Sequence, residues 1–255
     1  GDCQSKCEVA YPDNCHNRNA VSIPSNASCS SYYSDCSSKC SAWACNSGYE
    51  KSGNSCVAAV RVGSILYGDG TVASGLVTGK TPIGIVFDTE NRLAVALTDI
   101  DKSGSAGSTK MKWSTSNFNV SGLSDCYSGN LTTCGVDGRT NTNTILANIY
   151  SGTTYAANGA NAYEPRGCSK DFCKKTKWFL PSMRDLITLY NAKSYMNASL
   201  SLTASSGAKT LTESDYYWSS TEGSSNFVWA LRMSDGERIW SAKTYGRYVR
   251  PVLAF

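Results

Sequence analysis

Apolar residues gather in short runs over the second part of this sequence, and polar turn residues separate the runs. AAVRVGSILYGDG (58–70) and GIVFDTENRLAVALTDI (84–100) are rich in β-type residues and are bounded by Gly, Asp and Asn. This pattern predicts short strands. DTEN (88–91) lies between IGIVF and RLAVAL, so we expect it to be the turn of a β-hairpin.

A helical period replaces this pattern in WFLPSMRDLITLYNAKS (178–194). Ser182 is a favourable N-cap, and Asp185 occupies the third helical position, as in a capping box. A second helix is expected through TNTNTILANIY (140–150), where Ile145 and Ile149 are four residues apart. Strands and helices together predict an α+β fold with many turns. One face of the first helix carries Met183, Leu186, Ile187 and Tyr190.

FVWALRM (227–233) predicts a strand near the C-terminal end. Side chains of a strand alternate between two faces, so one set packs inward and the other reaches solvent. We expect Trp229, Leu231 and Met233 to point inward, and Ala230, Arg232 and Ser234 to point outward. Phe227 opens the strand, where alternation does not fix its side. Later core positions are predicted at Trp240, Tyr248, Val249, Val252 and Phe255.

Composition narrows the function classes. The chain has 255 residues, of which 41% are hydrophobic and 17% charged, as in a packed globular protein. A net charge of +4 is too small and too scattered to indicate nucleic-acid binding. No apolar run reaches the length that spans a bilayer, so no transmembrane segment is expected. The chain starts GDCQSKC, which has no signal-peptide pattern, so we expect either that the protein has none or that it has been removed.

Twelve cysteines are unevenly spread. Cys126/Cys134 and Cys168/Cys173 form two close pairs, which we expect to be local bridges. An even count in a short segment favours disulfides, whereas zinc sites usually use CxxC or mixed Cys/His ligands. The chain has no CxxC and one histidine, His16. We therefore expect an oxidising compartment, secreted, cell-surface or periplasmic. The N-terminal cysteines should pair among themselves, in one of about 105 ways; they are Cys3, Cys7, Cys15, Cys29, Cys36, Cys40, Cys45 and Cys56.

Four sequence stretches carry a resemblance: WFLPSMRDLITLY, YYWSSTE, VWALRMSDG and YVRPVLAF, in this order. They resemble the C-terminal domain of bacterial collagen-like adhesins, which has a C-type-lectin-like fold of the formylglycine-generating-enzyme type. YWSSTE and YVRPVLAF are also similar to the variable proteins of diversity-generating retroelements. The resemblance covers roughly residues 58–255 and implies a ligand-binding domain there. Residues 1–57 lie outside it and form a small disulfide-rich module, loosely EGF-like.

The retroelement resemblance implies a variable region at about residues 215–250. Such systems mutate template adenines, and Trp, Met, Lys, Glu and Gln cannot be reached from an AAC codon. Trp229, Met233, Glu237, Trp240 and Lys243 are therefore scaffold candidates. The SDGE turn (234–237) should return the chain beside the strand, and Gly246 should permit a tight bend. The expected ligand-binding face consists of Phe227, Ala230, Arg232, Ser234, Arg238, Ile239, Ser241, Thr244, Tyr245, Gly246 and Arg247.

Enzymatic activity and metal binding are not expected. Formylglycine-generating enzymes depend on reactive cysteines near the C-terminal part of the fold, and this chain has none after Cys173. A catalytic triad would have to use His16, which lies in the Cys-rich segment and which we interpret as a surface or packing residue. Calcium-binding lectins use Glu-Pro-Asn-like and Trp-Asn-Asp-like motifs, and the nearest string here is EPR (164–166). DIDKSG (99–104) begins like an EF-hand loop but has Lys110 at the twelfth position, which favours a polar turn over a structural calcium.

The function expected is that of an exported binding protein with a sequence-variable face for a protein or glycan ligand. The alternatives are a surface enzyme on a formylglycine-generating-type scaffold and a structural pilus or adhesin subunit. A basic cluster flanks Cys168 and Cys173. We interpret it as a solvated loop, with a patch for anionic glycans as the alternative. Its residues are Lys170, Lys174, Lys175 and Lys177.

Overall fold

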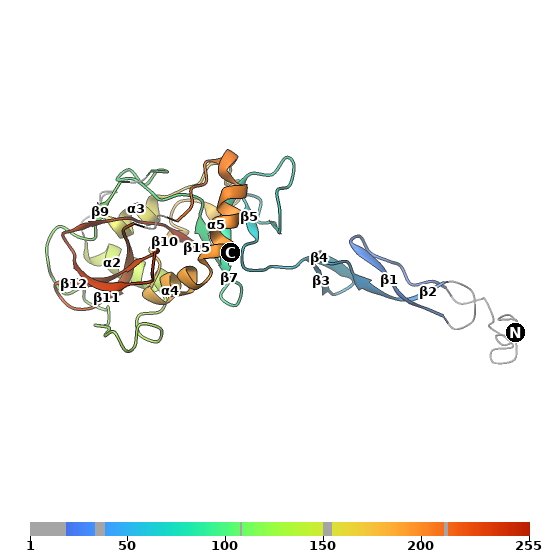
Figure 1. Ribbon diagram of the computed structural model, residues 1–255, viewed down its shortest axis with the longest axis horizontal. Helices are drawn as coiled ribbons and strands as arrows, with labels where there is room; N and C mark the ends of the chain where they lie inside the picture. The colour runs from blue at the N-terminus through green and yellow to red at the C-terminus, as the bar shows by residue number, and fades with distance from the viewer. Residues whose placement is uncertain (1–18, 34–38, 108, 150–154, 212–213) are drawn as a thin grey trace, which may run out of the picture. The chain divides into compact units, whose positions relative to one another are not determined.

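The computed structural model describes residues 19–33, 39–107, 109–149, 155–211 and 214–255 (Figure 1). Contacts within the chain divide it into two compact units, Gly1–Ala59 and Val60–Phe255. The boundary lies close to the one expected between residues 57 and 58.

Two β-hairpins make up the described part of the first unit. β1 (Ala27–Tyr32) pairs antiparallel with β2 (Cys40–Cys45), and β3 (Tyr49–Ser52) pairs with β4 (Ser55–Ala58). Disulfides join Cys29 to Cys40 and Cys45 to Cys56. The described residues of this unit bury almost only the half-cystines Cys40 and Cys56, so the bridges hold the module in place of an apolar core. Cys3, Cys7, Cys15, His16 and Cys36 lie outside the described residues.

A six-stranded sheet forms the centre of the second unit. Its strands are β5 (Ile65–Tyr67), β6 (Val72–Ala73), β7 (Pro82–Asp88), β8 (Leu93–Ala96), β10 (Trp178–Phe179) and β15 (Val252–Ala254), in the order β10-β15-β8-β7-β5-β6. The hairpin expected at DTEN is confirmed, because β7 and β8 pair antiparallel around it. Within the turn, Asn91 donates hydrogen bonds to the Asp88 carboxylate from its backbone and its side chain.

Helices cover this sheet and the adjoining strands. They are α2 (Gly138–Asn148), α3 (Ala156–Ala162), α4 (Met183–Asn191) and α5 (Lys193–Leu202), with 3-10 turns η1 (Asp171–Cys173) and η2 (Ala204–Ser206). Both predicted helices are confirmed. Ser182 and Asp185 form the complete capping box of α4, and Asp137 caps α2 by accepting from the Thr140 amide. Helices and sheets together confirm the expected α+β class.

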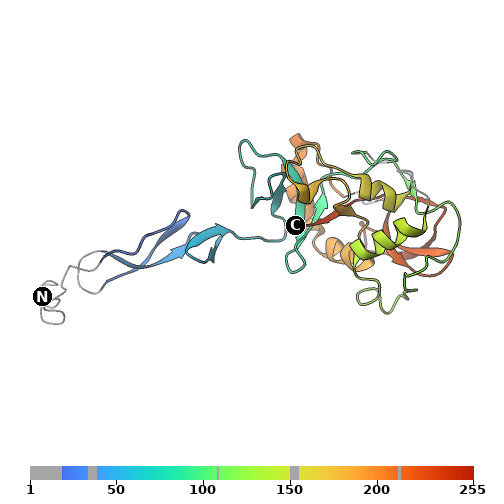
Figure 2. The same cartoon turned by 180° about the vertical axis from the view of Figure 1, so that it is seen from behind.

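A separate three-stranded sheet carries most of the candidate site. It consists of β11 (Tyr216–Glu222), β12 (Phe227–Arg232) and β13 (Arg238–Ala242), in that order, so β13 is an edge strand. The hairpin expected at SDGE is confirmed between β12 and β13. Beside it, β9 (Met111–Lys112) pairs with β14 (Gly246–Arg247). Seen from behind, α2 lies next to β11 (Figure 2).

Apolar side chains pack on both faces of the β11–β12 pair. Tyr217, Trp229, Leu231 and Met233 belong to one core cluster, as expected for the inward set. Trp218, Val228 and Ala230 belong to a second cluster on the other face. Trp229, Val249 and Val252 are buried as predicted, and Trp178, Leu186 and Trp218 are buried too. Tyr248 and Phe255 are half-buried. The prediction for Trp240 is wrong, because 45% of its surface is exposed.

Candidate recognition site on the β12–β13 hairpin

Register decides which hairpin residues share a side. Phe227 pairs with Ala242, Trp229 with Trp240 and Leu231 with Arg238, while Val228 pairs with Ser241 and Ala230 with Ile239. Directly opposed residues of an antiparallel pair project to the same face. The predicted single face therefore separates into two. We call the side that carries Phe227, Arg238 and Trp240 the aromatic side, and the opposite one the arginine side.

The aromatic side exposes two large rings at once. Phe227 is 37% exposed and Trp240 is 45% exposed. Their ring centroids are 6.1 Å apart, with 18° between the planes, so the two rings are stacked. Trp240 also meets the buried ring of Trp229 edge to face, at 5.4 Å and 71°. A large aromatic residue on a rigid support offers contact area at a low cost in side-chain entropy.

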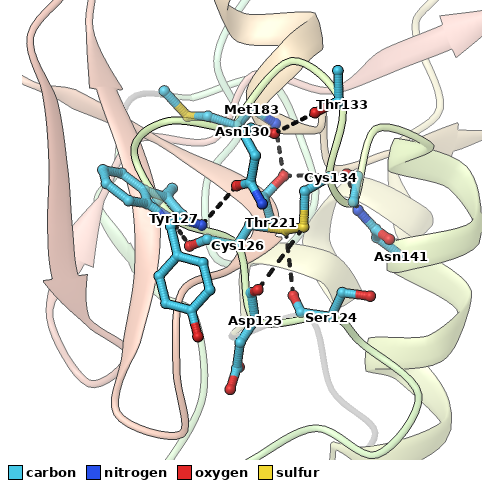
Figure 3. The surroundings of a disulfide bond; sticks show 12 residues. Ser124, Asp125, Cys126, Tyr127, Asn130, Thr133, Cys134, Asn141, Met183 and Thr221 are labelled. Atoms are coloured by element: carbon cyan, nitrogen blue, oxygen red, sulfur yellow. Dashed lines mark hydrogen bonds between the residues drawn. A yellow bond between two sulfur atoms is a disulfide. The ribbon is translucent and has the colours of Figure 1, made fainter.

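Trp229 owes its fixed position to the disulfide loop that contains Cys126 and Cys134. The Trp229 indole donates a 2.8 Å hydrogen bond to the Cys126 carbonyl, and the Cys126 amide donates to the Glu222 carbonyl at 2.9 Å. The bridge itself is the predicted one. Figure 3 shows the loop closed by a hydrogen bond from the Tyr127 amide to the Asn130 side chain. The loop therefore fixes the ring on which Trp240 rests.

Gly223 lies where the two indole rings come together. A Cβ atom added at Gly223 would stand 3.0 Å from Nε1 of Trp240 and 3.2 Å from Nε1 of Trp229. The absence of a side chain at this position lets β11 end close beside both rings.

Tyr127, which follows the half-cystine Cys126, adds another exposed ring, with 61% of its surface accessible.

An arginine–tyrosine cluster forms the arginine side. Two guanidinium groups lie over the Tyr216 ring, with Cζ of Arg232 and Cζ of Arg247 each 5.2 Å from its centroid. Arg247 Nε also donates to Ser241 Oγ at 3.2 Å. These two cation–π contacts hold the tyrosine ring in place.

Carboxylates neutralise this cluster. Arg232 donates two hydrogen bonds to Asp235 and also pairs with Glu237, which accepts a 2.6 Å hydrogen bond from the Tyr216 hydroxyl. The hydrogen bond to Glu237 raises the pKa of Tyr216 above its ordinary value. Hydrogen bonds from Arg232 hold the pKa of Asp235 well below its usual range. The arginine side is thus internally paired, while the aromatic side presents unpaired apolar surface.

Two residues of the predicted face are buried, so they cannot be displayed. Ala230 is fully buried and Ser241 is 2% exposed. Ala230 belongs to the second core cluster, which includes Met111 and Trp113, and Ser241 is paired with Val228 of the same cluster. A third expectation is also wrong, because Gly246 forms no bend. It belongs to β14 and pairs with Lys112 of β9.

The remaining predicted face residues are accessible to different degrees. Tyr245 is 60% exposed, and Ser234 and Arg238 are also exposed. Arg232, Ile239, Thr244, Gly246 and Arg247 are half-buried. The residues that sequence reasoning missed are Trp240, Tyr127 and Tyr216. For Trp240 the reason is that nothing in the local pattern revealed β13 as an edge strand.

The EF-hand-like stretch is a polar turn with its carboxylates engaged. Asp101 accepts from the Ser103 amide, the Ser103 hydroxyl and the Ser105 amide. These bonds, led by the Ser103 hydroxyl, lower the pKa of Asp101. Asp99 pairs with the buried Arg250 at 3.0 Å. Among the described residues, no group of three or more His, Cys, Asp or Glu side chains is placed to hold a metal ion.

The basic cluster surrounds the second predicted bridge, Cys168–Cys173, which is confirmed. Lys174 pairs with Glu164 at 3.1 Å and also donates to the Cys168 carbonyl. Glu164, from the EPR string, additionally accepts from the Lys175 amide. One lysine of the cluster is therefore committed to holding its own loop.

None of the helices in the described part of the chain combines the length and apolar character needed to cross a membrane.

Comparison with known proteins identifies the family of the second unit. Residues 105–253 match the family model of the Lcl C-terminal domain, and this match spans more than half of the chain. The chain belongs to the Lcl C-terminal domain family. The matched residues include β11, β12 and β13, so both sides of the hairpin lie within the Lcl C-terminal domain. This match supports the expected resemblance to adhesin C-terminal domains.

A solved structure shares the fold. A fimbrial protein from Bacteroides ovatus ATCC 8483 matches with a TM-score of 0.53 and 19% sequence identity, over 77% of this chain. The match covers 49% of the fimbrial protein, so the chain spans about half of that protein's length. At this identity the likeness concerns the fold alone. No curated protein matches the sequence.

Proposed function

We propose that this protein is a surface adhesin-like protein that binds its ligand through the aromatic side of the β12–β13 hairpin. The observation that carries the proposal is the exposed Phe227–Trp240 pair supported by the buried Trp229. Exposed aromatic rings with an adjacent arginine, here Arg238, are the usual composition of a binding hot spot. The protein acts by recognition and not by catalysis.

The disulfides support a surface location for this protein, because they indicate an oxidising environment. Four disulfides join the eight cysteines that the structure describes. Such bridges persist outside the cell and in the periplasm. All eight thiols are consumed, so none of these cysteines offers the reactive thiolate that formylglycine-generating chemistry requires. Membership of the Lcl C-terminal domain family is consistent with adhesion.

Sequence variability of the hairpin is part of the proposal. The retroelement hypothesis assigns Trp240 and Lys243 to the scaffold and allows Phe227 and Arg238 to vary. The aromatic side would then combine one constant ring with variable neighbours. A near-copy of the codons for residues 215–250, differing at adenines and lying beside a reverse-transcriptase gene, is the expected DNA signature. Its absence from the genome would count against variability without affecting ligand binding.

The ligand can be sought with two probe sets, a glycan array and an immobilised extract of cell-surface proteins. The wild-type chain is compared with Trp240→Ala and with Tyr195→Ala. Tyr195 is 64% exposed on α5 and serves as the matched control. We expect binding to be lost in the Trp240 variant and retained in the Tyr195 variant. Equal binding by all three chains would overturn the proposed site.

The salt dependence of ligand binding distinguishes a site on the aromatic side from a site on the basic cluster. Ion pairs between exposed charges weaken as the Debye length falls from about 8 Å at physiological salt to about 3 Å at 1 M. Binding through Phe227 and Trp240 should persist at high salt. Binding through the lysines around Cys168 and Cys173 should instead disappear at high salt. Loss of binding at high salt would therefore indicate that the ligand site lies on that loop.

A structural subunit of a fimbria is the second candidate, because a fimbrial protein shares the fold. That function predicts assembly of the purified chain with itself or with other subunits, and it requires no exposed ring at position 240. Sedimentation of wild type and Trp240→Ala as equal-sized assemblies, without ligand binding by either, would favour it.

A further inference from the structure

Glu222 and Lys243 form a fully buried pair at the base of the recognition hairpin. Glu222 ends β11 and Lys243 follows β13, so β12 and β13 lie between them in the sequence. Both side chains are 0% exposed, and Lys243 Nζ contacts Glu222 Oε1. The aromatic rings of Trp113 and Phe118 lie 5.0 and 5.5 Å from Nζ. The two groups therefore meet in an apolar enclosure.

If the two groups form an ion pair, one oxygen atom of the buried carboxylate is left without a hydrogen bond. Glu222 Oε1 accepts from the Val120 amide at 3.3 Å as well as from Lys243, and Lys243 Nζ donates to the Phe118 carbonyl at 2.5 Å. Glu222 Oε2 is buried and has no hydrogen-bond partner among the described residues. A buried carboxylate with one unpaired oxygen is costly, because desolvation of both charges is only partly offset.

Burial also favours the neutral forms of both groups. It raises the pKa of Glu222, and Lys243 opposes that shift only in part. It lowers the pKa of Lys243, against the opposing effect of Glu222. A neutral amine carries the free electron pair that attacks a carbonyl carbon, and a neutral carboxylic acid can lose its hydroxyl as water. Groups held in contact react with the high effective concentration of an intramolecular process.

We propose that Glu222 and Lys243 are joined by a side-chain amide bond. The Nζ electron pair of Lys243 forms a bond to Cδ of Glu222, and the bond from Cδ to Oε2 breaks. Oε2 leaves as water with its own proton and one proton from the amine, so the reaction needs no oxidant, reductant or further reactant. The product is neutral and contains one oxygen and one N–H.

Every polar atom of the amide finds a partner in the observed surroundings. Oε1 keeps the hydrogen bond from the Val120 amide, and the remaining N–H keeps its bond to the Phe118 carbonyl. The unpaired Oε2 is gone. The bond would close the chain around β12 and β13, so the hairpin could change its exposed residues without separating from β11. This inference does not depend on what the hairpin binds.

Mass spectrometry of the wild-type chain decides the question directly. After complete reduction of the disulfides, we expect the intact mass to fall below the sequence mass by one water molecule. Trypsin cleaves after Arg232 and Arg238, which lie between the two residues. The digest should contain one species that joins peptide 210–232 to peptide 239–247, because an acylated Lys243 resists cleavage.

Two variants complete the experiment. Lys243→Arg cannot form the amide and should have its full sequence mass. Lys174→Arg alters the exposed Lys174–Glu164 pair instead and should keep the deficit of one water. The wild-type measurement stands even if Lys243→Arg fails to fold. A full wild-type mass with separate peptides 210–232 and 239–243 would overturn the proposal and leave a buried ion pair. A deficit that maps to other residues would overturn it as well.

Discussion

Trp229 and Trp240 are directly opposed across β12 and β13, yet only one of them is buried. Trp229 lies on a central strand and donates its indole N–H to the Cys126 carbonyl. Trp240 lies on the edge strand, and among the described residues no further strand pairs with its outer flank. The difference between the two residues thus arises from strand position and not from side-chain chemistry.

This contrast predicts unequal effects of truncation. Trp229→Ala should lower the free energy of unfolding by roughly 3–5 kcal/mol, the range for a buried Trp. Trp240→Ala should cost only about 1 kcal/mol, near the typical effect of a single substitution. Thermal or denaturant unfolding of the two variants provides the measurement. Equal losses, or a wild-type melting temperature for Trp229→Ala, would contradict the assignment of the two rings.

Sequence alternation predicted the buried side of β12 correctly, but on the other side it missed the burial of Ala230. Trp229, Leu231 and Met233 are buried as predicted. Ala230 was expected outside, but the same alternation places it in a second core cluster with Val228. Alternation indicates which residues share a side of the strand. Only the tertiary packing determines whether that side is exposed to solvent. The apolar character of Val228 and Ala230 was the available sign of a second buried face.

Among the secondary-structure features, the N-terminal cap of helix α4 was predicted best from the sequence. The Ser182–Asp185 capping box depends on residues three apart, so short-range physics is sufficient to predict it. The pairing of β14 with β9 joins residues far apart in the chain, and no local pattern indicates it. The aromatic side was only partly predictable for the same reason, since its exposure depends on the edge position of β13.

The N-cap of α2 should make stability depend on pH. Burial alone would raise the pKa of Asp137, but hydrogen bonds from the Thr140 amide and hydroxyl and from the Arg139 amide outweigh it, so the pKa is lowered. Its stabilisation is therefore present above the unfolded pKa and is lost as pH falls through the folded pKa. Asp137→Ala should cost about 1 kcal/mol at neutral pH, and this cost should shrink below about pH 4.

Asp137→Asn is the matched control, because Asn caps helices about as well as Asp but does not titrate. It should retain most of the stability at neutral pH. Denaturant unfolding of the three chains between neutral and acidic pH provides the measurement. A cost for Asp137→Ala that stays constant down to strongly acidic pH would show that the carboxylate charge contributes nothing.

The Cys126–Cys134 bridge should support ligand binding as well as stability. Replacing both cysteines by Ser should cost about 2–3 kcal/mol, because the open loop gains entropy in the unfolded chain. It should also loosen the Cys126 carbonyl that fixes Trp229. The Cys168/Cys173 double Ser variant is the control, since that bridge adjoins Gly68 and not the hairpin. The melting temperature and the affinity for the ligand should both fall in the first variant. The control should lose stability but keep its affinity.

At the scale of the whole molecule, the two units depend on different forces. The first is held by its bridges, whereas the second has two apolar clusters in its core. The cysteines outside the described residues are Cys3, Cys7, Cys15 and Cys36, and we predict that they pair among themselves. Peptide mapping of the unreduced chain provides the measurement. A free thiol among them, or a bridge from one of them to the second unit, would contradict this prediction.

The central claim is that the exposed Phe227–Trp240 pair binds the ligand while the buried scaffold beneath it maintains the fold. The most direct measurement is the dissociation constant of the Phe227→Ala/Trp240→Ala double variant for the glycan or surface protein that the wild-type chain captures, with a melting curve of the same sample. We predict at least a tenfold weaker affinity, about 1.4 kcal/mol, and a folded, cooperatively melting protein. Wild-type affinity in a folded double variant would contradict the claim.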